Sequence, residues 1–385
     1  MPHSAALSSV AQGQTIRLFL CGDVMLGRGI DQVLPHPCDP SLHEDYVGSA
    51  LDYVRLAETA NGPIARPVGN AYVWGDALEE LTEAQPDARI INLETSITRS
   101  EDYEPKGINY RMSPESAECL SEAGIDCCML ANNHVLDWGR AGLLETLATL
   151  QRLRIQSAGA GRNLDEAAAP AIVPIPDKGR VVAYSFASPT SGTPHGWAAM
   201  PDQAGVNLLP DLSAATASSV IDRIVRDRQA GDLIVVSIHW GPNWGYSIPG
   251  DQQRFAHRLI DGANVAIVHG HSSHHPKAIE RYRDQLILYG CGDFLNDYEG
   301  IRGYEEFRGD LAIMYLVDLE SGSGALAGLD MVPFRMQRFQ LVRPPAADIA
   351  WLYETLGREC ATLGTQLAMR ADGRISLQTQ DDASA

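Results

Sequence analysis

The sequence predicts a layered α/β protein, and two observations support this. Short apolar runs typical of buried strands alternate along the chain with longer segments typical of helices, as in sheets covered by helices. From residue 277 onward, strand-like runs follow one another as in hairpins. The sequence shows no internal repeat and no linker. We therefore expect one domain with insertions rather than two domains.

The expected elements can be given in chain order. The expected strands span residues 16–21, 88–92, 126–130, a short run near 155, 181–186, 233–238 and 264–268, followed by 278–283, 285–289, 311–317 and 331–339. The expected helices span residues 76–83, 116–123, 142–153, 214–228, 252–260 and 346–360. Residues 35–70 hold scattered Pro, His and Asp with little periodicity, so we expect a surface insertion there that shapes a pocket.

The composition is that of an acidic globular protein. The 385 residues carry a formal net charge of -19 without a cluster of Lys and Arg, which excludes a nucleic-acid surface. The seven cysteines lack the spacing of a zinc ribbon or a disulfide framework, so we expect reduced core thiols and a reducing compartment. No run approaches a membrane span of roughly 18 apolar residues, and the first residues lack a signal-peptide pattern. These features predict a cytoplasmic protein without a membrane span.

A histidine cluster predicts a metal site. The apolar run 264–268 leads into four imidazoles within seven positions, His269, His271, His274 and His275. Imidazole is the commonest protein ligand for transition metals, and the end of a buried strand presents it from a rigid base. A solvated histidine-rich loop is the alternative interpretation. The ends of the other strands favour the metal site.

Metal-competent side chains follow the carboxyl ends of five expected strands. They are Asp23; Glu94; Asn132, Asn133 and His134, with Asp137 nearby; His239; and His271 with His274. Loops at one end of an open α/β sheet converge on one crevice, so we expect these groups to meet in space. Each of them alone also fits a plain role, such as a turn-forming aspartate or a buried histidine with a hydrogen-bond partner.

Together these residues resemble the CapA family, whose founding members take part in poly-gamma-glutamate capsule synthesis. The resemblance covers residues 17–339 and rests on Gly22-Asp23-Val24-Met25-Leu26-Gly27-Arg28, Asn92-Leu93-Glu94, Ala131-Asn132-Asn133-His134 with Asp137 and Gly139, His239-Trp240-Gly241, Gly270-His271-Ser272-Ser273-His274 and Gly292-Asp293-Phe294. It implies the α/β/β/α sandwich of the calcineurin-like metallophosphoesterases, with insertions. We expect this domain to span residues 15–340. Residues 341–385 would add a helix and a strand packed on the same domain.

The resemblance also implies a ligand set for one or two divalent ions of Mn, Fe or Zn, which suit mixed carboxylate, amide and imidazole ligands. One ion would be held by Asp23, Glu94 and His274, the other by Glu94, Asn133, His239 and His271, with Glu94 as the bridge. His134 would act as the catalytic acid and Asp137 would orient it. Asp293 would support a ligand histidine through a hydrogen bond.

Further residues are expected around this centre, and one position departs from the phosphoesterase pattern. Arg28 and His269 would contact a substrate anion or support the ligands, and Tyr110 and Arg111 would offer a phenol and a cation to the substrate. Where those enzymes usually carry Asp-x-His after the first strand, this chain has Met25, a weak ligand. The first metal position is therefore expected to be weaker or differently filled.

Three functions follow as hypotheses. The first is a metal-dependent hydrolase acting on a phosphoester, or on an ester or amide bond of an anionic peptide-like substrate. The second is a metal-dependent peptide epimerase of a natural-product pathway, which removes and returns a Cα proton. The third is a non-catalytic metal-binding subunit in polyglutamate or capsule synthesis. The expected partner is a small-molecule or peptide substrate, and the sequence gives no indication of an oligomeric state.

Overall fold

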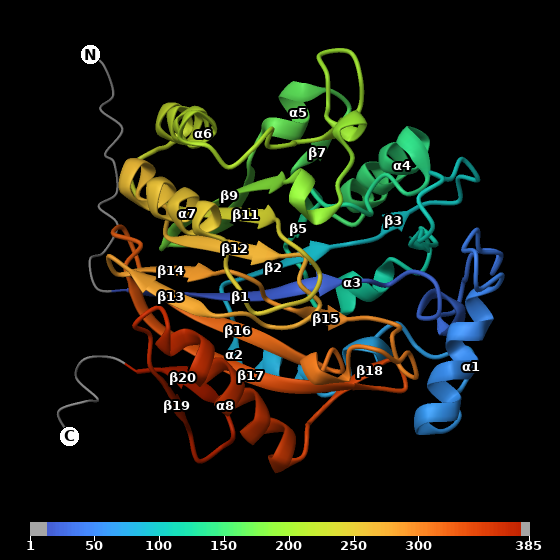
Figure 1. Cartoon of the computed structure of the whole chain (residues 1–385). Coiled ribbons are helices and arrows are strands. Elements are labelled where there is room, and N and C mark those ends of the chain that lie inside the picture. Colours follow the sequence, from blue (N-terminus) through green and yellow to red (C-terminus); the bar gives the residue numbers. More distant parts are fainter. Residues whose placement is uncertain (1–13, 379–385) are drawn as a thin grey trace.

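The computed structural model describes residues 14–378 and has the predicted α/β class (Figure 1). Ten strands form the larger sheet: β1 (Thr15–Val24), β2 (Ala88–Leu93), β5 (Cys127–Met129), β6 (Gln156–Ala158), β15 (Asp293–Leu295), β16 (Leu311–Glu320), β17 (Leu326–Gln337), β18 (Gln340–Val342), β19 (Leu367–Met369) and β20 (Ile375–Leu377). Their order is β19-β20-β17-β16-β1-β2-β5-β6, with β15 paired to β1 and β18 to β17. Strands β1, β2, β5 and β6 run parallel, so their carboxyl ends lie at one edge.

The second sheet has six strands. These are β8 (Ala171–Ile175), β9 (Gly179–Ala187), β11 (Asp232–His239), β12 (Ile267–His271), β13 (Ile279–Tyr282) and β14 (Gln285–Leu288), in the order β13-β14-β12-β11-β9-β8. The pairs β11 with β9 and β11 with β12 are parallel. Two small pairs complete the strands, β3 (Ser96–Ile97) with β4 (Arg111–Met112) and β7 (Ala160–Gly161) with β10 (Gly205–Val206).

Helices cover the sheets. They are α1 (Ala50–Asn61), α2 (Ala77–Ala84), α3 (Glu118–Glu122), α4 (Gly139–Arg152), α5 (Leu164–Ala168), α6 (Ala214–Asp227), α7 (Gly250–Ala263) and α8 (Ala346–Ala361). Short 3-10 turns lie at η1 (Asp31–Val33), η2 (Tyr72–Trp74), η3 (Pro189–Ser191), η4 (His195–Trp197) and η5 (Glu305–Phe307). Helices α6 and α7 lie side by side on the outer face of the six-stranded sheet, as Figure 1 shows.

Three apolar clusters account for this layering. Strand β1 contributes to two of them, because successive side chains of a strand point to opposite faces. Leu18 and Leu20 pack towards the six-stranded sheet, whereas Phe19 and Cys21 pack among the buried residues of α1 to α4. The third cluster lies between the six-stranded sheet and helices α6 and α7. Strand β1 is thus buried on both faces, which makes its carboxyl end a rigid base for a functional side chain.

The structure confirms most expected elements, displaces one strand and adds several elements, among them α1, α5, β8 and β15. The insertion at 35–70 contains helix α1, which Ser49 caps by accepting from the Leu51 amide. Its buried face, Ala50, Tyr53, Val54 and Ala57, does have helical spacing, but two small alanines carry half of it. Strand β8, which pairs with β9, was not predicted. The strand expected over 264–268 is displaced, because α7 runs to Ala263 and β12 begins only at Ile267.

The C-terminal part of the chain joins the larger sheet. Strand β20 pairs with β17, and α8 packs beside β13 and β19. Residues 379–385 of the predicted extension lie outside the described residues, and the domain boundaries stay a prediction. All seven cysteines are buried free thiols, as expected. Within residues 14–378, no helix combines the length and the apolar character that crossing a membrane requires.

Candidate metal centre

The carboxyl ends of strands from both sheets meet at one place. In the six-stranded sheet His239 and His271 are register neighbours at the ends of β11 and β12. In the larger sheet Asp23 at the end of β1 is in register with Asn92 of β2 and with Asp293 of β15. Parallel neighbours in register present their side chains on the same side of a sheet. The two sheets therefore bring these groups face to face.

The close approach of β15 to β1 depends on a glycine. A Cβ atom placed on Gly22 would lie 1.7 Å from the carbonyl oxygen of Gly292. The amide of Asp23 donates to this same carbonyl at 3.0 Å. The Gly-Asp pair at the end of β1 is thus explained by packing as well as by chemistry: the glycine admits β15, which carries Asp293 next to Asp23.

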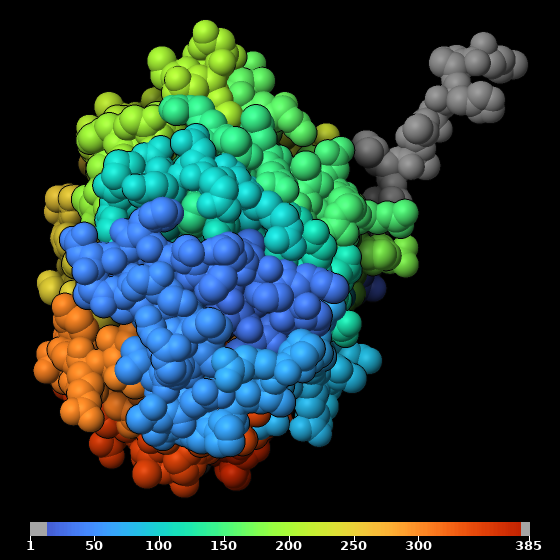
Figure 2. Space-filling model, turned by 90° about the vertical axis from the view of Figure 1, so that its right-hand side faces the viewer, coloured from blue at the N-terminus to red at the C-terminus, as the bar shows by residue number. Residues whose placement is uncertain are grey.

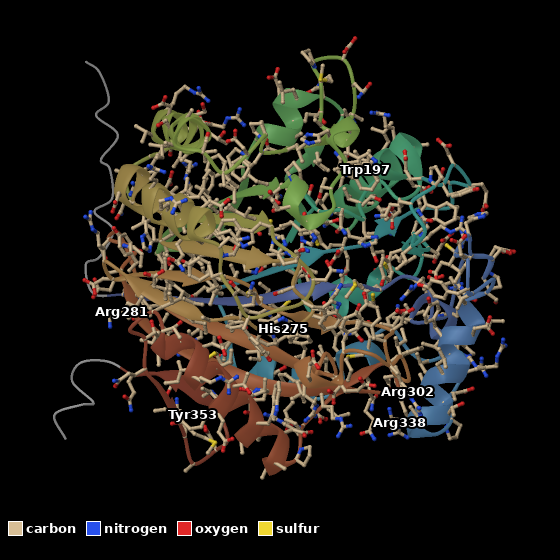
Figure 3. All side chains as sticks on the ribbon, in the orientation of Figure 1. Trp197, His275, Arg281, Arg302, Arg338 and Tyr353 are labelled. Atoms are coloured by element: carbon tan, nitrogen blue, oxygen red, sulfur yellow. The ribbon has the colours of Figure 1, made fainter. Side chains whose placement is uncertain are left out.

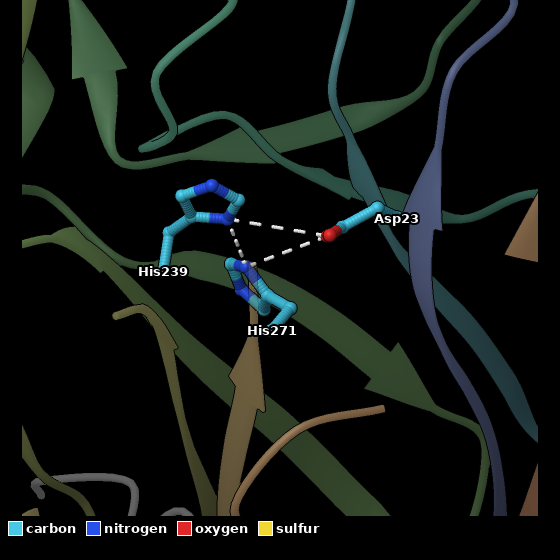
Figure 4. Close-up of side chains that lie close together, drawn as sticks. All are labelled: Asp23, His239 and His271. Carbon is cyan, nitrogen blue, oxygen red and sulfur yellow. Dashed lines mark hydrogen bonds and ion pairs between the residues drawn. The ribbon is translucent and has the colours of Figure 1, made fainter. Parts of the chain in front are cut away.

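Asp23, His239 and His271 form the first group of candidate ligands (Figure 4). The two Nδ1 atoms of the histidines lie 2.7 Å apart. Oδ1 of Asp23 lies 4.0 Å from Nδ1 of His239 and 3.8 Å from Nδ1 of His271. All three side chains are buried. Three buried donor atoms therefore face one small volume.

Asp23, His274 and Asp293 form a second group of candidate ligands. Nδ1 of His274 lies 2.9 Å from Oδ1 of Asp293, so the expected contact between Asp293 and a histidine is present. On its other side, Nε2 of His274 lies 3.0 Å from the amide of Asn243. Asp23 is the residue common to both groups. The bridging role that the resemblance implies for Glu94 stays a prediction.

Glu94 and Asn133 lie on the far side of the His239 ring. Nε2 of His239 is 2.9 Å from Oδ1 of Asn133 and 3.5 Å from Oε1 of Glu94, whereas its Nδ1 faces His271. The three residues expected to hold one ion together with His239 thus approach both of its ring nitrogens instead of a single one. Oε2 of Glu94 is buried without a hydrogen-bond partner among the described residues. A buried, unpartnered carboxylate oxygen is what a cation would satisfy.

His134 lies next to these groups and is held by two further residues. Its Nδ1 is 2.7 Å from Oδ2 of Asp137, as the predicted orienting role requires, and its Nε2 is 3.7 Å from Oε1 of Glu94. Nζ of Lys106 lies 2.7 Å from the other oxygen of Asp137 and also donates to the carbonyl of Asn133. Lys106 comes from the loop between β3 and β4, and no sequence motif places this loop at the site. Lys106 does not directly follow any expected strand, so nothing in the sequence indicated that it would lie at the site.

The electrostatics of the centre favour a bound cation. Burial, reinforced by the charge of Asp293, raises the pKa of Asp23 to about 7. Burial and the charge of Asp23 raise the pKa of Glu94 well above its ordinary range. Burial also lowers the pKa of His239 and of His271, which keeps both imidazoles neutral and able to bind a metal. This mixture of buried carboxylates and neutral imidazoles fits a divalent Mn, Fe or Zn ion.

We expect the metal affinity to decrease as the pH is lowered below about 7. At pH 6 Asp23 is mostly protonated, so a metal ion must displace that proton, whereas His239 and His271 are neutral and have no imidazolium proton to lose. The affinity for Mn²⁺ should fall roughly tenfold per pH unit for each proton displaced. Calorimetric titrations at pH 6, 7 and 8, in two buffers of different ionisation enthalpy, would measure both affinity and proton release. A constant affinity with no proton release would contradict this.

The residues expected to contact substrate are held by the protein itself. The guanidinium of Arg28 pairs with Asp297 at 2.5 Å and with Glu44 at 3.0 Å, fully buried. The guanidinium of Arg111 stacks on Trp138 and pairs with Glu101. His269 bridges the Ser237 hydroxyl and the Cys21 carbonyl. The Ser237 hydroxyl also lies 2.7 Å from Nε2 of His271. Of its two expected roles, His269 therefore has the position that suits support of a ligand.

Met25 and two tyrosines line the remaining side of the centre. The Met25 sulfur accepts from the hydroxyl of Tyr298 at 3.5 Å, and this hydroxyl lies 2.8 Å from that of Tyr110. The Tyr110 ring packs edge-on against His134, and the Tyr298 ring packs edge-on against His274. The sequence marked Tyr110 as a phenol near the substrate, but nothing in it indicated that Tyr298 would lie beside it.

Comparisons with known proteins identify the family. The family model described as bacterial capsule synthesis protein PGA_cap matches residues 17–298. A probable polyglutamine synthesis accessory protein of Mycobacterium tuberculosis is 44% identical over 364 residues, covering 94% of this chain and 96% of that protein. The PGA biosynthesis protein CapA of Bacillus subtilis is 27% identical over 76% of this chain and 66% of that protein. The capsule biosynthesis protein CapA of Bacillus anthracis is 24% identical over 85% of this chain and 69% of that protein. The chain therefore belongs to the PGA_cap family of bacterial capsule synthesis proteins, which includes CapA.

Proposed function

We propose that the protein is a metal-dependent hydrolase that acts on a phosphoester, or on an ester or amide bond of an anionic peptide-like substrate. The observation that carries this proposal is the pair of buried donor groups that share Asp23 and lie beside His134. Divalent ions held by these groups would polarise the bond to be cleaved and acidify the attacking water. The three-cluster layering supports the finer inference that the fold is a metallophosphoesterase-like α/β/β/α sandwich.

His134 is the residue we assign to proton transfer. Burial lowers its pKa to about 4, so the ring is neutral at pH 7. Asp137 accepts the Nδ1 proton, which leaves the Nε2 lone pair directed towards Glu94 and the metal centre. A neutral imidazole in this orientation takes a proton from the attacking water and returns it to the leaving group. Lys106 neutralises Asp137 and holds the carboxylate in place.

Two substitutions separate metal binding from proton transfer. Glu94→Ala is expected to lose both metal and turnover, whereas His134→Gln should keep the metal and lose turnover by about 10² to 10⁴-fold. Metal content after dialysis and hydrolysis rates on phosphoesters and anionic peptides would measure the two effects. His257→Gln is the matched control, because His257 pairs with Glu280 on α7 and β13, away from the centre. Full turnover by Glu94→Ala would overturn the proposal.

A non-catalytic role is the second candidate. It is favoured by the name of the Mycobacterium tuberculosis relative, a synthesis accessory protein. If the protein is not a catalyst, it would retain metal at useful affinity and cleave none of the phosphoesters and anionic peptides. His134→Gln would then leave the metal content unchanged and would have no turnover to abolish. The epimerase hypothesis stays a prediction. Solvent deuterium incorporated at a peptide Cα without bond cleavage would establish it.

A further inference from the structure

A cavity of about 730 Å³ opens beside the metal centre. His274 and Asn243 form its inner wall, together with Tyr110 and Tyr298, whose rings contact His134 and His274. A ligand that fills the cavity would therefore contact His274, a candidate ligand of the metal centre. The volume lies within the range of pockets that enclose most of a small organic ligand.

Aromatic and aliphatic side chains form a large part of the lining of this cavity. Tyr53 and Trp244 continue the wall that Tyr110 and Tyr298 begin, and the ring of Trp244 stacks on Tyr304 with centroids 4.2 Å apart. At the mouth, four large apolar side chains are exposed to solvent, namely Tyr46, Ile108, Ile301 and Tyr304. A concentration of exposed apolar side chains around one opening is a sign of ligand contact.

The mouth is built from segments far apart in the sequence. The carbonyl of Leu56 in α1 lies against Gly300, and Asn61 donates to Glu299 at 2.6 Å. Figure 2 shows this face, with the segment of α1 beside the segment around residue 300. Arg302 also lies at this end of the molecule, close to α1 (Figure 3). The predicted insertion at 35–70 thus contributes to the pocket, as expected.

The charges of the cavity do not suit a polyanion. Of the four arginines that line it, Arg28 pairs with Glu44 and Asp297, and Arg308 and Arg335 each pair with Asp310 and Asp348. Among the described residues Arg302 is the one lining arginine without an ion pair. The lining also contains the acidic side chains Glu299, Glu305 and Asp310. A chain of carboxylates would find one arginine without an ion pair and, in Glu299 and Glu305, two carboxylates of its own sign that no arginine or lysine pairs with among the described residues.

We infer that this cavity takes an aromatic or aliphatic group of the substrate. This group would lie next to the anionic group whose bond the metal centre would act on. The substrate class is an amphipathic molecule, such as an ester, amide or phosphoester of an aryl or alkyl group, and not an extended run of glutamates. This inference rests on the proposed function, since it names the substrate class of the same site. Burial of the apolar group supplies binding free energy in proportion to the area removed from water.

A matched pair of non-hydrolysable probes tests the inference. Methylphosphonate and 1-naphthylmethylphosphonate carry the same anionic head and differ in the apolar group. On the full-length protein, isothermal titration calorimetry should give at least about tenfold tighter binding of the naphthyl compound. It should also bind more tightly than a γ-linked glutamate tetramer. Equal affinities for the two phosphonates, no measurable binding of the naphthyl one, or tighter binding of the tetramer would overturn the inference.

Two surface variants locate the binding site. Ile301→Asp places a charge at the mouth and should weaken the naphthyl compound roughly tenfold, while the affinity for methylphosphonate stays unchanged. Ile172→Asp is the control, because Ile172 is equally exposed on β8 and does not line the cavity. The same effect in both variants would overturn the inference. Binding of these probes requires no turnover. The tighter binding of the naphthyl compound can therefore be observed even if the hydrolase proposal fails, and hydrolysis can be observed even if the two phosphonates bind equally.

Discussion

Asp23→Asn is expected to abolish stable metal binding, with affinity for Mn²⁺ lowered by roughly 100-fold or more. Asp23 is the residue common to both candidate groups, so one substitution removes a charged ligand from each. Asp23 accepts from the Asn92 side chain at 2.7 Å through Oδ1 and from the Ser272 backbone at 3.1 Å through Oδ2. The single oxygen of the asparagine can keep one of these two hydrogen bonds, so we expect Asp23→Asn to fold with a stability lowered by the loss of the other. Elemental mass spectrometry after dialysis and calorimetric titration with Mn²⁺ would measure the loss of metal binding.

A second buried aspartate provides the control for this substitution. Asp31 is also fully buried, and burial raises its pKa to about 6, but it accepts from the backbone amides of Cys38 and Ser113 and belongs to neither donor group. Asp31→Asn should keep its metal even where it loses stability. In thermal unfolding, added Mn²⁺ should stabilise this control and the natural protein but not Asp23→Asn. An affinity of Asp23→Asn for Mn²⁺ within a few fold of that of the natural protein would contradict the assignment of Asp23 to both donor groups.

Arg28→Met is expected to lower the free energy of unfolding by about 3 to 5 kcal/mol. The Arg28 side chain is buried, holds Asp297 through two hydrogen bonds and pairs with Glu44, while its guanidinium stacks on Tyr53. Removing the cation leaves two buried carboxylates without a counter-charge, a far larger cost than the loss of a surface ion pair. Urea unfolding at neutral pH would measure the change.

A triple substitution distinguishes this structural role from a contact with substrate. When Arg28→Met is combined with Glu44→Gln and Asp297→Asn, no uncompensated charge is left, and most of the lost stability should return. If Arg28 instead served mainly to bind a substrate anion, the single substitution would change stability by less than about 1 kcal/mol and impair binding alone. That result would restore the role in anion contact that the sequence suggested.

The positions of the candidate ligands along the chain were readable from the sequence for a local reason. Short apolar runs such as 16–21 and 233–238 mark buried strands, and a polar residue that follows such a run stands at the strand end. This was enough to select Asp23 and His239. The neighbouring helix α1 escaped this reasoning because its buried face is half alanine, a weak apolar signal. Ser49, which caps this helix, is by contrast a typical N-cap residue and is a signal that the sequence does contain.

The amino-acid sequence by itself determined the α/β class, the family and the candidate ligands, because periodicity and motifs are local properties of a chain. Only the tertiary structure decided how these residues relate. The register of β1 with β15 brought Asp293 beside Asp23, and that of β11 with β12 set His239 against His271. Folding also paired Arg28 with Glu44 and with the distant Asp297, and it placed Lys106 and Tyr298 beside the centre. Register and ion-pair partners depend on contacts between residues far apart in the chain, and local patterns do not specify them.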